Sequence, residues 1–283
     1  MKITWKHFFN FSFFLELFLF AFTMFLSIGV AVNLINKSAL STSQVGQVAQ
    51  SGFSAIEFIF LFIIATLVLI LLLKYFKQPW IVKALFYLAI FEGLWFFSHA
   101  YFTWPEMLYV LAFLLISWFV YRNIFIHNIV IILAISAIAV IFGLNFDPSA
   151  VIIILLFLTI YDFWAVYKTK HMVKMFQGLV KSRVYFSLII PHSFKGLFNK
   201  TRDVSPSTQF MFLGTGDLAL PAILVTSSLK ISIYSSFYTA LGAIAGFIFL
   251  YVLFVTQEQR APMPGLPPII LGTLIGYLIS FII

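Results

Sequence analysis

The chain has 283 residues, of which 63% are hydrophobic and only 9% charged, with a mean hydropathy of +1.08. This composition excludes a soluble one- or two-domain protein, because apolar runs of about 18 or more residues, each long enough to cross about 30 Å of hydrocarbon, recur along the whole chain. The net charge of +8 does not indicate nucleic-acid binding, since Lys and Arg lie between the apolar runs, where they set topology, and the absence of cysteine excludes thiol chemistry.

Nine apolar spans follow one another, and we expect each to form a membrane-spanning helix. In chain order they cover about 8–34, 53–73, a third ending near 99, 105–121, a fifth ending near 146, 150–167, 209–229, 234–255 and 267–283. Arg122-Asn123 and Asp147-Pro148 are typical turn sequences between them. The predicted fold class is therefore an all-α polytopic membrane protein, a single membrane domain over residues 1–283. Helices one to six lie in 1–167, a basic connecting loop in 168–208, and helices seven to nine in 209–283.

The basic residues predict an orientation for this arrangement. If the N-terminus is cytoplasmic, fifteen of the seventeen Lys and Arg residues fall in inside segments, against Lys37 and Lys230 outside. Cytoplasmic segments of membrane proteins carry such an excess of Lys and Arg. We therefore expect the N-terminus inside and the C-terminus outside.

The basic connection contains a segment with apolar residues at helical spacing. Met172, Met175, Phe176 and Leu179 alternate with lysines, which is typical of an amphipathic helix at the membrane surface. Such a helix over the cytoplasmic ends of the spans would act either as a gate for a substrate or only as a surface anchor. The sequence leaves both interpretations open.

Two aspartates lie inside predicted spans, Asp162 in the sixth and Asp217 in the seventh. A charged side chain at this depth costs a few kcal/mol or more, so such residues usually have a function and face a partner or water. Counted from the inner boundaries at 1.5 Å per residue, Asp162 is roughly 9 Å deep and Asp217 roughly 12 Å deep. The matching depth predicts that the two carboxylates meet.

Two carboxylates in one low-dielectric site cannot both ionise easily, so one keeps its proton. Such a pair supplies a base that activates water and an acid that protonates the scissile amide. Gly214 and Gly216 remove side chains where another helix or a substrate backbone comes close, and Pro221 lacks the N–H that would bond the carbonyl of Asp217. Aspartyl protease chemistry is the function that these residues favour.

Tyr161-Asp162 and Gly214-Thr215-Gly216-Asp217 resemble the YD and GxGD motifs of the presenilin and signal peptide peptidase family of intramembrane aspartyl proteases. A third family motif, Pro-Ala-Leu at the start of the ninth helix, resembles Pro264-Gly265-Leu266-Pro267, with Gly265 in place of the usual alanine as in archaeal-type presenilin homologues. The order of the motifs and their helices also match. The resemblance covers essentially the whole chain.

The resemblance implies an endopeptidase that cleaves transmembrane helices of single-span or signal-peptide-like substrates within the lipid bilayer, in an archaeal-type cell membrane. Asp162 and Asp217 would be catalytic, Tyr161, Gly214, Thr215 and Gly216 would support them, and residues 264–267 would position the substrate. No metal or organic cofactor is implied, and a homo-oligomer is left open. Because Met263 and Leu266 each precede a proline, we expect this segment to be extended and able to pair with an unwound substrate.

Two other functions use the same residues. An ion- or proton-coupled transporter or a cation leak could employ the two aspartates, although no internal repeat of the kind that builds transporters is visible. A scaffold with a relic active site is a third hypothesis. Of the other carboxylates within spans, Glu16 and Glu57 lie near span ends and are expected to reach the interface or pair, whereas Glu92 is deeper and has no explanation. Gly242-x-x-x-Gly246 and Gly272-x-x-x-Gly276 predict close helix packing.

Overall fold

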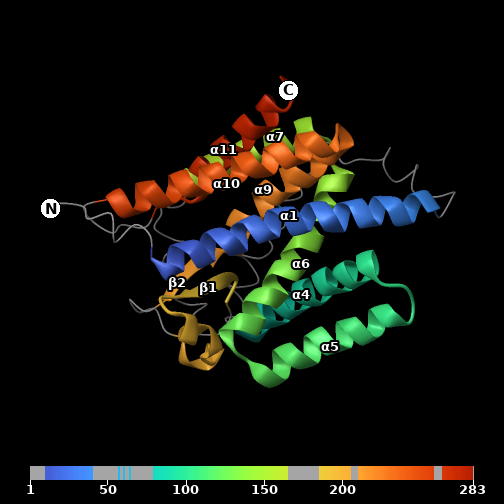
Figure 1. The fold of residues 1–283 in the computed structure, drawn as a ribbon, viewed down its shortest axis with the longest axis vertical. Helices are drawn as coiled ribbons and strands as arrows, with labels where there is room; N and C mark the ends of the chain where they lie inside the picture. Colours follow the sequence, from blue (N-terminus) through green and yellow to red (C-terminus); the bar gives the residue numbers. More distant parts are fainter. Residues whose placement is uncertain are drawn as a thin grey trace.

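The structure, a computed structural model, describes residues 10–40, 79–164, 185–204, 210–257 and 263–282, together with the single positions 57, 60 and 64. Its α-helices are α1 (Phe11–Leu40), α4 (Pro79–Tyr101), α5 (Glu106–Tyr121), α6 (Ile124–Asn145), α7 (Pro148–Trp164), α9 (Thr215–Ser227), α10 (Ile233–Thr256) and α11 (Leu266–Ile279) (Figure 1). The described part is thus mainly helical, as predicted. The predicted second span lies almost wholly outside the described residues.

The described helices differ in their capacity to span a membrane. Three are long and apolar enough to cross it, namely residues 11–37 of α1, α6 and α10. Helices α5, α7 and α11 are equally apolar but have 10–17 residues each. The helix boundaries at Arg122-Asn123 and Asp147-Pro148 are confirmed: Asn123 caps α6 by accepting the Ile126 N–H at 2.9 Å, and Pro148 begins α7.

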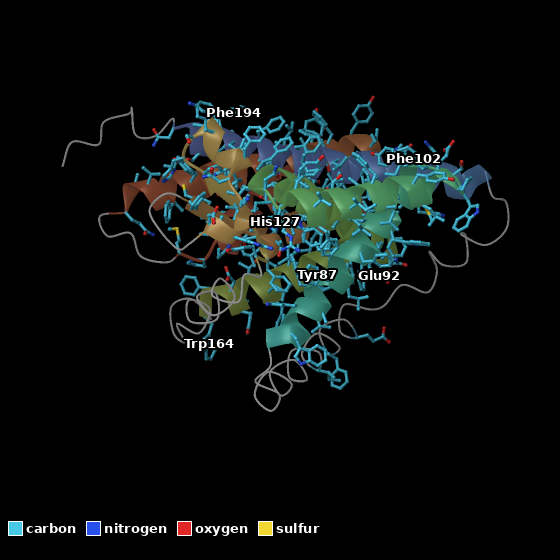
Figure 2. All side chains as sticks on the ribbon, turned by 90° about the horizontal axis from the view of Figure 1, so that it is seen from below. Tyr87, Glu92, Phe102, His127, Trp164 and Phe194 are labelled. Atoms are coloured by element: carbon cyan, nitrogen blue, oxygen red, sulfur yellow. The ribbon has the colours of Figure 1, made fainter. Side chains whose placement is uncertain are left out.

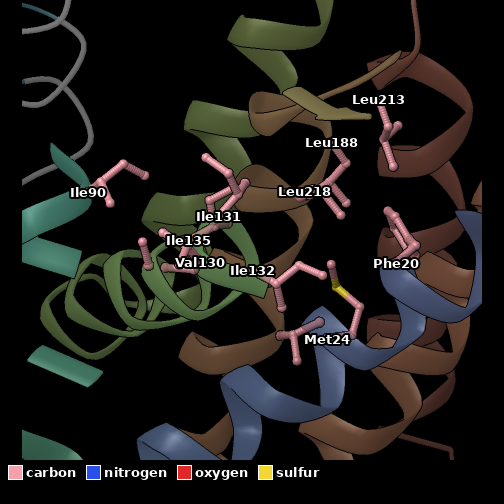
Figure 3. Packing of buried hydrophobic residues seen from close by; sticks show 14 of the residues in the cluster. Phe20, Met24, Ile90, Val130, Ile131, Ile132, Ile135, Leu188, Leu213 and Leu218 are labelled. Atoms are coloured by element: carbon pink, nitrogen blue, oxygen red, sulfur yellow. The ribbon is translucent and has the colours of Figure 1, made fainter. Parts of the chain in front are cut away.

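Helix α6 lies at the centre, where it packs against α1, α4 and α9, while α5 lies at the edge beside α4 (Figure 1). Fully buried side chains of α1 and α6, such as Phe20 and Ile132, belong to one apolar cluster with Leu213 and Leu218 (Figure 3). These last two residues flank the Gly-Thr-Gly-Asp sequence on both sides. The largest core of the molecule therefore holds the segment that carries Asp217.

A two-stranded antiparallel sheet departs from the predicted all-α architecture. Strand β1 (Ser187–Pro191) pairs with β2 (Phe210–Gly214) in a register that sets Ser187 opposite Gly214. The predicted seventh helix, expected to start at residue 209, is wrong in its first part, because these residues form β2 and the helix begins only at Thr215. A five-residue apolar run looks the same in a buried strand and in the first turns of an apolar helix.

Part of the connection predicted as a loop over 168–208 has regular secondary structure, in residues 185–204. Besides β1, residues 185–204 form the short 3-10 helices η3 (Phe194–Phe198) and η4 (Thr201–Asp203). Ile189 and Leu197 from this segment are buried together with Ile124 at the start of α6. The segment thus packs as part of the fold, whereas the predicted amphipathic helix around Met172 lies outside the described residues.

The predicted close packing of the two GxxxG sequences is confirmed. Helices α10 and α11 contact each other along their length, and a Cβ added at Gly246 would lie 2.7 Å from the carbonyl oxygen of Pro268. A Cβ at Gly272 would lie 2.6 Å from the Cα of Gly246. The glycines let the two backbones touch, and this contact fixes the start of α11 relative to the rest of the bundle.

Candidate active site

Asp162 lies on α7, near its C-terminal end, and is only 6% exposed although it is a carboxylate. Its Oδ2 accepts a hydrogen bond from the backbone N–H of Leu266, with a distance of 3.4 Å between the two atoms. Leu266 is the first residue of α11. The N–H groups of a first helical turn have no partner within the helix, and the helix dipole favours negative charge there. Asp162 therefore sits at a position that suits a carboxylate.

The start of α11 differs from the extended segment that the sequence predicts. Gly265 is in the right-handed helical region, with φ −81° and ψ −33°, and Leu266 is already helical. The preference of a residue before proline for extended geometry is overridden here by the helix that follows. Since Pro267 and Pro268 have no N–H, Leu266 and Ile269 supply the first donors of α11, and Asp162 takes the first of them.

Asp217 lies in the first turn of α9, directly after β2. The depth predicted for it assumed helical rise from residue 209 and is therefore wrong, since strand residues advance about 3.3 Å each. Its carboxylate nevertheless lies close enough to Asp162 for the two charges to interact. The two carboxylates therefore lie near each other, Asp162 facing the N-terminus of α11 and Asp217 in the first turn of α9.

Glycines surround the carboxylate of Asp217. A Cβ added at Gly265 would lie 3.1 Å from its Oδ2, and a Cβ added at Gly214 would lie at the same distance from that atom. Gly216, in contrast, is exposed, and apart from its own helix and chain neighbours no described atom lies within 4 Å of an added Cβ. The first two glycines therefore give the carboxylate its room, while Gly216 leaves open space beside it.

The remaining residues of the three motifs are placed as follows. Thr215 donates to the carbonyl oxygen of Phe186 through both its backbone N–H and its hydroxyl, each at 3.3 Å, which ties the start of α9 to the segment before β1. Pro264 is buried beside Gly265. Tyr161 precedes Asp162 but its side chain is 52% exposed, so it turns away from the face of α7 that carries Asp162.

Side chains from two helices bind the outer edge of β1. The amide of Asn128 donates to the carbonyl oxygen of Ile189 at 2.8 Å and accepts the N–H of Ile189 at 2.9 Å. His127 lies with Nε2 3.3 Å from the Ser187 carbonyl oxygen, and Ser12 donates to the carbonyl oxygen of Pro191. Strand β1 is thus held between β2 and these side chains, which no sequence pattern predicted.

Asn128→Ala is expected to destabilise the protein by about 2–4 kcal/mol, because it leaves the N–H and the C=O of the fully buried Ile189 without partners. Thermal unfolding in detergent measures this as a lower midpoint. The matched control is Asn145→Ala, whose amide bonds only the carbonyl of Ile141 in its own helix. Equal midpoints for the two variants would contradict the role assigned to Asn128.

Glu16 is a third carboxylate near this site, and the sequence placed it wrongly. It was expected to reach the interface or pair, but it is 6% exposed and its Oε2 has no hydrogen-bond partner among the described residues. It lies close enough to Asp217 for the two like charges to repel, and Tyr251 of α10 also interacts with it. Neighbouring positions on the same face of α1 fix this orientation, since Ser12 contacts β1 and Phe20 stacks on Phe247 of α10.

Glu16→Met is expected to raise stability by about 1–3 kcal/mol, because it fills the same volume and removes a buried oxygen that has no hydrogen-bond partner among the described residues. The readout is the thermal unfolding midpoint in detergent. The control is Glu106→Met. Glu106 is exposed in the first turn of α5, where its carboxylate interacts favourably with the helix dipole. Its loss should therefore leave the unfolding midpoint unchanged or slightly lower. A lower midpoint for Glu16→Met than for wild type would show that Glu16 has a partner.

Glu92, in contrast, is exposed on α4, and nothing in the structure explains it (Figure 2). Within the described ranges no three His, Asp or Glu side chains lie close enough together to hold a metal ion. The carboxylates of Asp162 and Asp217 at the start of α11, with Glu16 nearby, are thus the candidate site.

The sequence matches the family described as signal-peptide peptidase, presenilin aspartyl protease over residues 17–283, which include all three motifs. The chain belongs to this family of aspartyl proteases. No curated protein matches the sequence. Two solved structures of a presenilin family intramembrane aspartate protease, one in space group C222 and one in P2, resemble its fold, with TM-scores of 0.60 and 0.61. Each is 22% identical in sequence, and the matches cover 93% of this chain and 94% and 96% of those chains.

At 22% sequence identity the two solved structures still share the fold of this member of the signal-peptide peptidase and presenilin family. The presenilin-like arrangement is shared over nearly the full length of the chain, although α5, α7 and α11 are short for membrane spans. The family that the motifs indicated, presenilin-type aspartyl proteases of membranes, is confirmed by the family match and the apolar helices.

Proposed function

We propose that this protein is an intramembrane aspartyl endopeptidase of the GxGD type, which hydrolyses peptide bonds of transmembrane helices with Asp162 and Asp217 as its catalytic pair. One observation carries the proposal: both carboxylates meet at the start of α11, where Asp162 accepts the Leu266 N–H and Gly265 lies against Asp217. Residues from α7, α9 and α11, distant in sequence, thereby form one site. Membership of the aspartyl protease family supports the same chemistry.

The chemistry follows from the pair. Two carboxylates that interact in a shielded site hold one proton between them. The ionised member takes a proton from water, whose oxygen attacks the carbonyl carbon of the scissile bond, and the protonated member gives its proton to the amide nitrogen as the C–N bond breaks. The products are a carboxylic acid and an amine, and the pair returns to its singly protonated state. No cofactor takes part in these steps.

The substrate backbone is proposed to pass along Gly214 and Gly216. A helical substrate hides its amides in its own hydrogen bonds, so it must unwind before it is cut. The open space at Gly216 leaves room for an extended backbone beside Asp217. Pro264, Gly265, Leu266 and Pro267 would border this space, because Gly265 contacts Asp217 on another side. Substrates are expected to be single-span or signal-peptide-like membrane proteins.

The membrane arrangement is proposed as the charge pattern predicts it: nine helices with the N-terminus in the cytoplasm, in a prokaryotic, archaeal-type cell membrane. This orientation favours substrates whose N-terminus is outside. The eight α-helices of the described residues are compatible with nine spans. Glycosylation-site insertion or accessibility labelling at residue 37 and at residue 195, on opposite predicted sides, measures the orientation.

The decisive experiment incubates purified protein, reconstituted in liposomes, with a single-span model substrate. We expect two fragments whose masses sum to the substrate plus one water, cut within the span, and inhibition by a transition-state analogue of aspartyl proteases. Cleavage that resists this inhibitor would contradict the proposal. So would absence of cleavage combined with a cation flux that depends on both aspartates, which is the behaviour of the transporter or leak considered above.

A further inference from the structure

A pocket of about 250 Å³ lies away from the aspartates, where α4 and α5 meet the start of α6 and the helix η4. Three cations line it, Lys83 of α4, Arg122 after α5 and Arg202 of η4, and neither Asp162 nor Asp217 does. Aromatic residues such as Trp118 and Tyr87 form its walls, and the buried His127 also lines it. The pocket is therefore both basic and aromatic.

The two arginines are brought together by backbone contacts rather than by chance proximity of long side chains. Arg122 has a left-handed conformation, with φ 44°, at the end of α5. Its carbonyl oxygen accepts the N–H of Thr201 at 2.8 Å and the hydroxyl of Thr201 at 3.0 Å, and Asn123 forms a β-bridge with Lys200. These bonds fix η4 against the turn, so that Arg202 and Arg122 line one cavity although like charges repel.

Among the described residues, no carboxylate forms an ion pair with these three cations, although Asp203 follows Arg202 in η4. The ion pair found there joins Lys230 to Asp147 and involves none of the three pocket cations. Arg122 uses its Nε–H for the carbonyl oxygen of Phe119, at 2.9 Å, which orients the guanidinium while leaving its terminal nitrogens for another partner. Positive charges gathered in a concave site attract anions, and arginine matches the paired oxygens of a phosphate.

The surroundings favour a lipid over a soluble anion. Tyr87 and Phe119 line the pocket and are still 44% and 49% exposed, as aromatic residues at a membrane interface often are. Helices α4 and α5 also expose Leu88, Ile116 and Val120 on their surface, which acyl chains can cover. The pocket also lies on the side of the molecule that the charge pattern assigns to the cytoplasm, where anionic headgroups bind basic pockets between helices.

We propose that this pocket binds the phosphate headgroup of an anionic phospholipid, whose acyl chains lie along the exposed faces of α4 and α5. The site is separate from the proteolytic pair, and the proposal does not depend on protease activity. Arg122 and Arg202 contact the phosphate, Lys83 adds charge at the wall formed by α4, and Trp118 lies close enough to the lipid to report on it.

The test measures quenching of tryptophan fluorescence by brominated phosphatidylglycerol added to the full-length protein in detergent. Subtracting the signal of Trp118→Phe isolates the contribution of Trp118. We compare Lys83→Gln/Arg202→Gln with Lys195→Gln/Lys200→Gln, a control that removes the same charge from exposed residues of the neighbouring segment outside the pocket. Because charge-assisted hydrogen bonds are lost, the pocket variant is expected to bind at least about tenfold more weakly, and the control unchanged.

A second variant tests whether weaker lipid binding by the first comes from a folding defect. Arg122→Asn removes the guanidinium and keeps a residue that tolerates the left-handed backbone, so it should weaken binding to a similar degree. Equal binding by pocket and control variants would overturn the proposal, because it would indicate general attraction to a basic surface. Displacement of the brominated lipid by glycerol phosphate as effectively as by unlabelled phosphatidylglycerol would overturn the lipid assignment in favour of a soluble phosphate.

Discussion

Asp162→Asn and Asp217→Asn are each expected to lower cleavage of a single-span substrate by at least about 10³-fold, because an amide can neither take a proton from water nor give one to the leaving nitrogen. Both substitutions keep the side-chain shape. In Asp162→Asn the amide oxygen can still accept the Leu266 N–H, so the start of α11 keeps its contact. The measurement is the initial rate of fragment formation in liposomes, followed by mass spectrometry.

The control for this pair is Asp147→Asn, which removes an exposed aspartate whose pairing with Lys230 contributes little to stability. Its rate should equal that of wild type. Unfolding midpoints of all three variants must be at least as high as that of wild type, so that a lost rate is a catalytic effect. If either site variant cleaves within tenfold of wild type, the two residues do not act as a catalytic pair.

Gly265→Val is expected to lower kcat by about 100-fold, because a side chain there pushes on the carboxylate of Asp217, and small displacements of reacting groups are costly. A Cβ alone would lie 3.1 Å from Oδ2, so Gly265→Ala requires a shift of only a few tenths of an ångström. The alanine variant should therefore keep most of the activity, in agreement with the alanine of the family motif that this segment resembles.

Gly216→Ala, in the first turn of α9, provides the contrasting substitution to Gly265→Val. Its Cβ meets no atom of another described segment within 4 Å, so we expect the fold and Asp217 to be unaffected. Since the substrate is proposed to occupy that space, KM should rise while kcat stays close to wild type. Kinetics in mixed micelles with a fluorogenic peptide separate the two parameters. A loss of kcat in Gly216→Ala, or none in Gly265→Val, would contradict the placement of substrate and carboxylate.

The sequence was sufficient to single out the two aspartates, because a carboxylate inside an apolar run is costly and usually has a function. Each of the two also has the other as a candidate partner in the next span. The sequence also predicted the tight turn at Arg122 and close helix packing at the two GxxxG sequences, because each of these signals is a short pattern of neighbouring residues. The apolar runs located most of the described helices to within a few residues. These features depend on local patterns, which a sequence displays directly.

The features that the sequence missed depend on contacts between distant segments. Strand β2 is apolar throughout, and only its pairing with β1 distinguishes it from the start of an apolar helix. It was therefore assigned to a helix. Leu266 was expected to be extended, but the helix N-terminus facing Asp162 decides its conformation. Glu16 lies in a helix that is apolar all round, where no periodicity shows which face is buried against Asp217.

The glycines around Asp217 have a consequence for selectivity. A site that offers backbone and empty space beside its carboxylate, at Gly214, Gly216 and Gly265, contains few side chains that could distinguish one substrate residue from another. Such an enzyme would tolerate many sequences at the cut, and the rate of each would depend on how readily the substrate helix unwinds, with helix-weakening residues such as glycine near the cut favouring turnover.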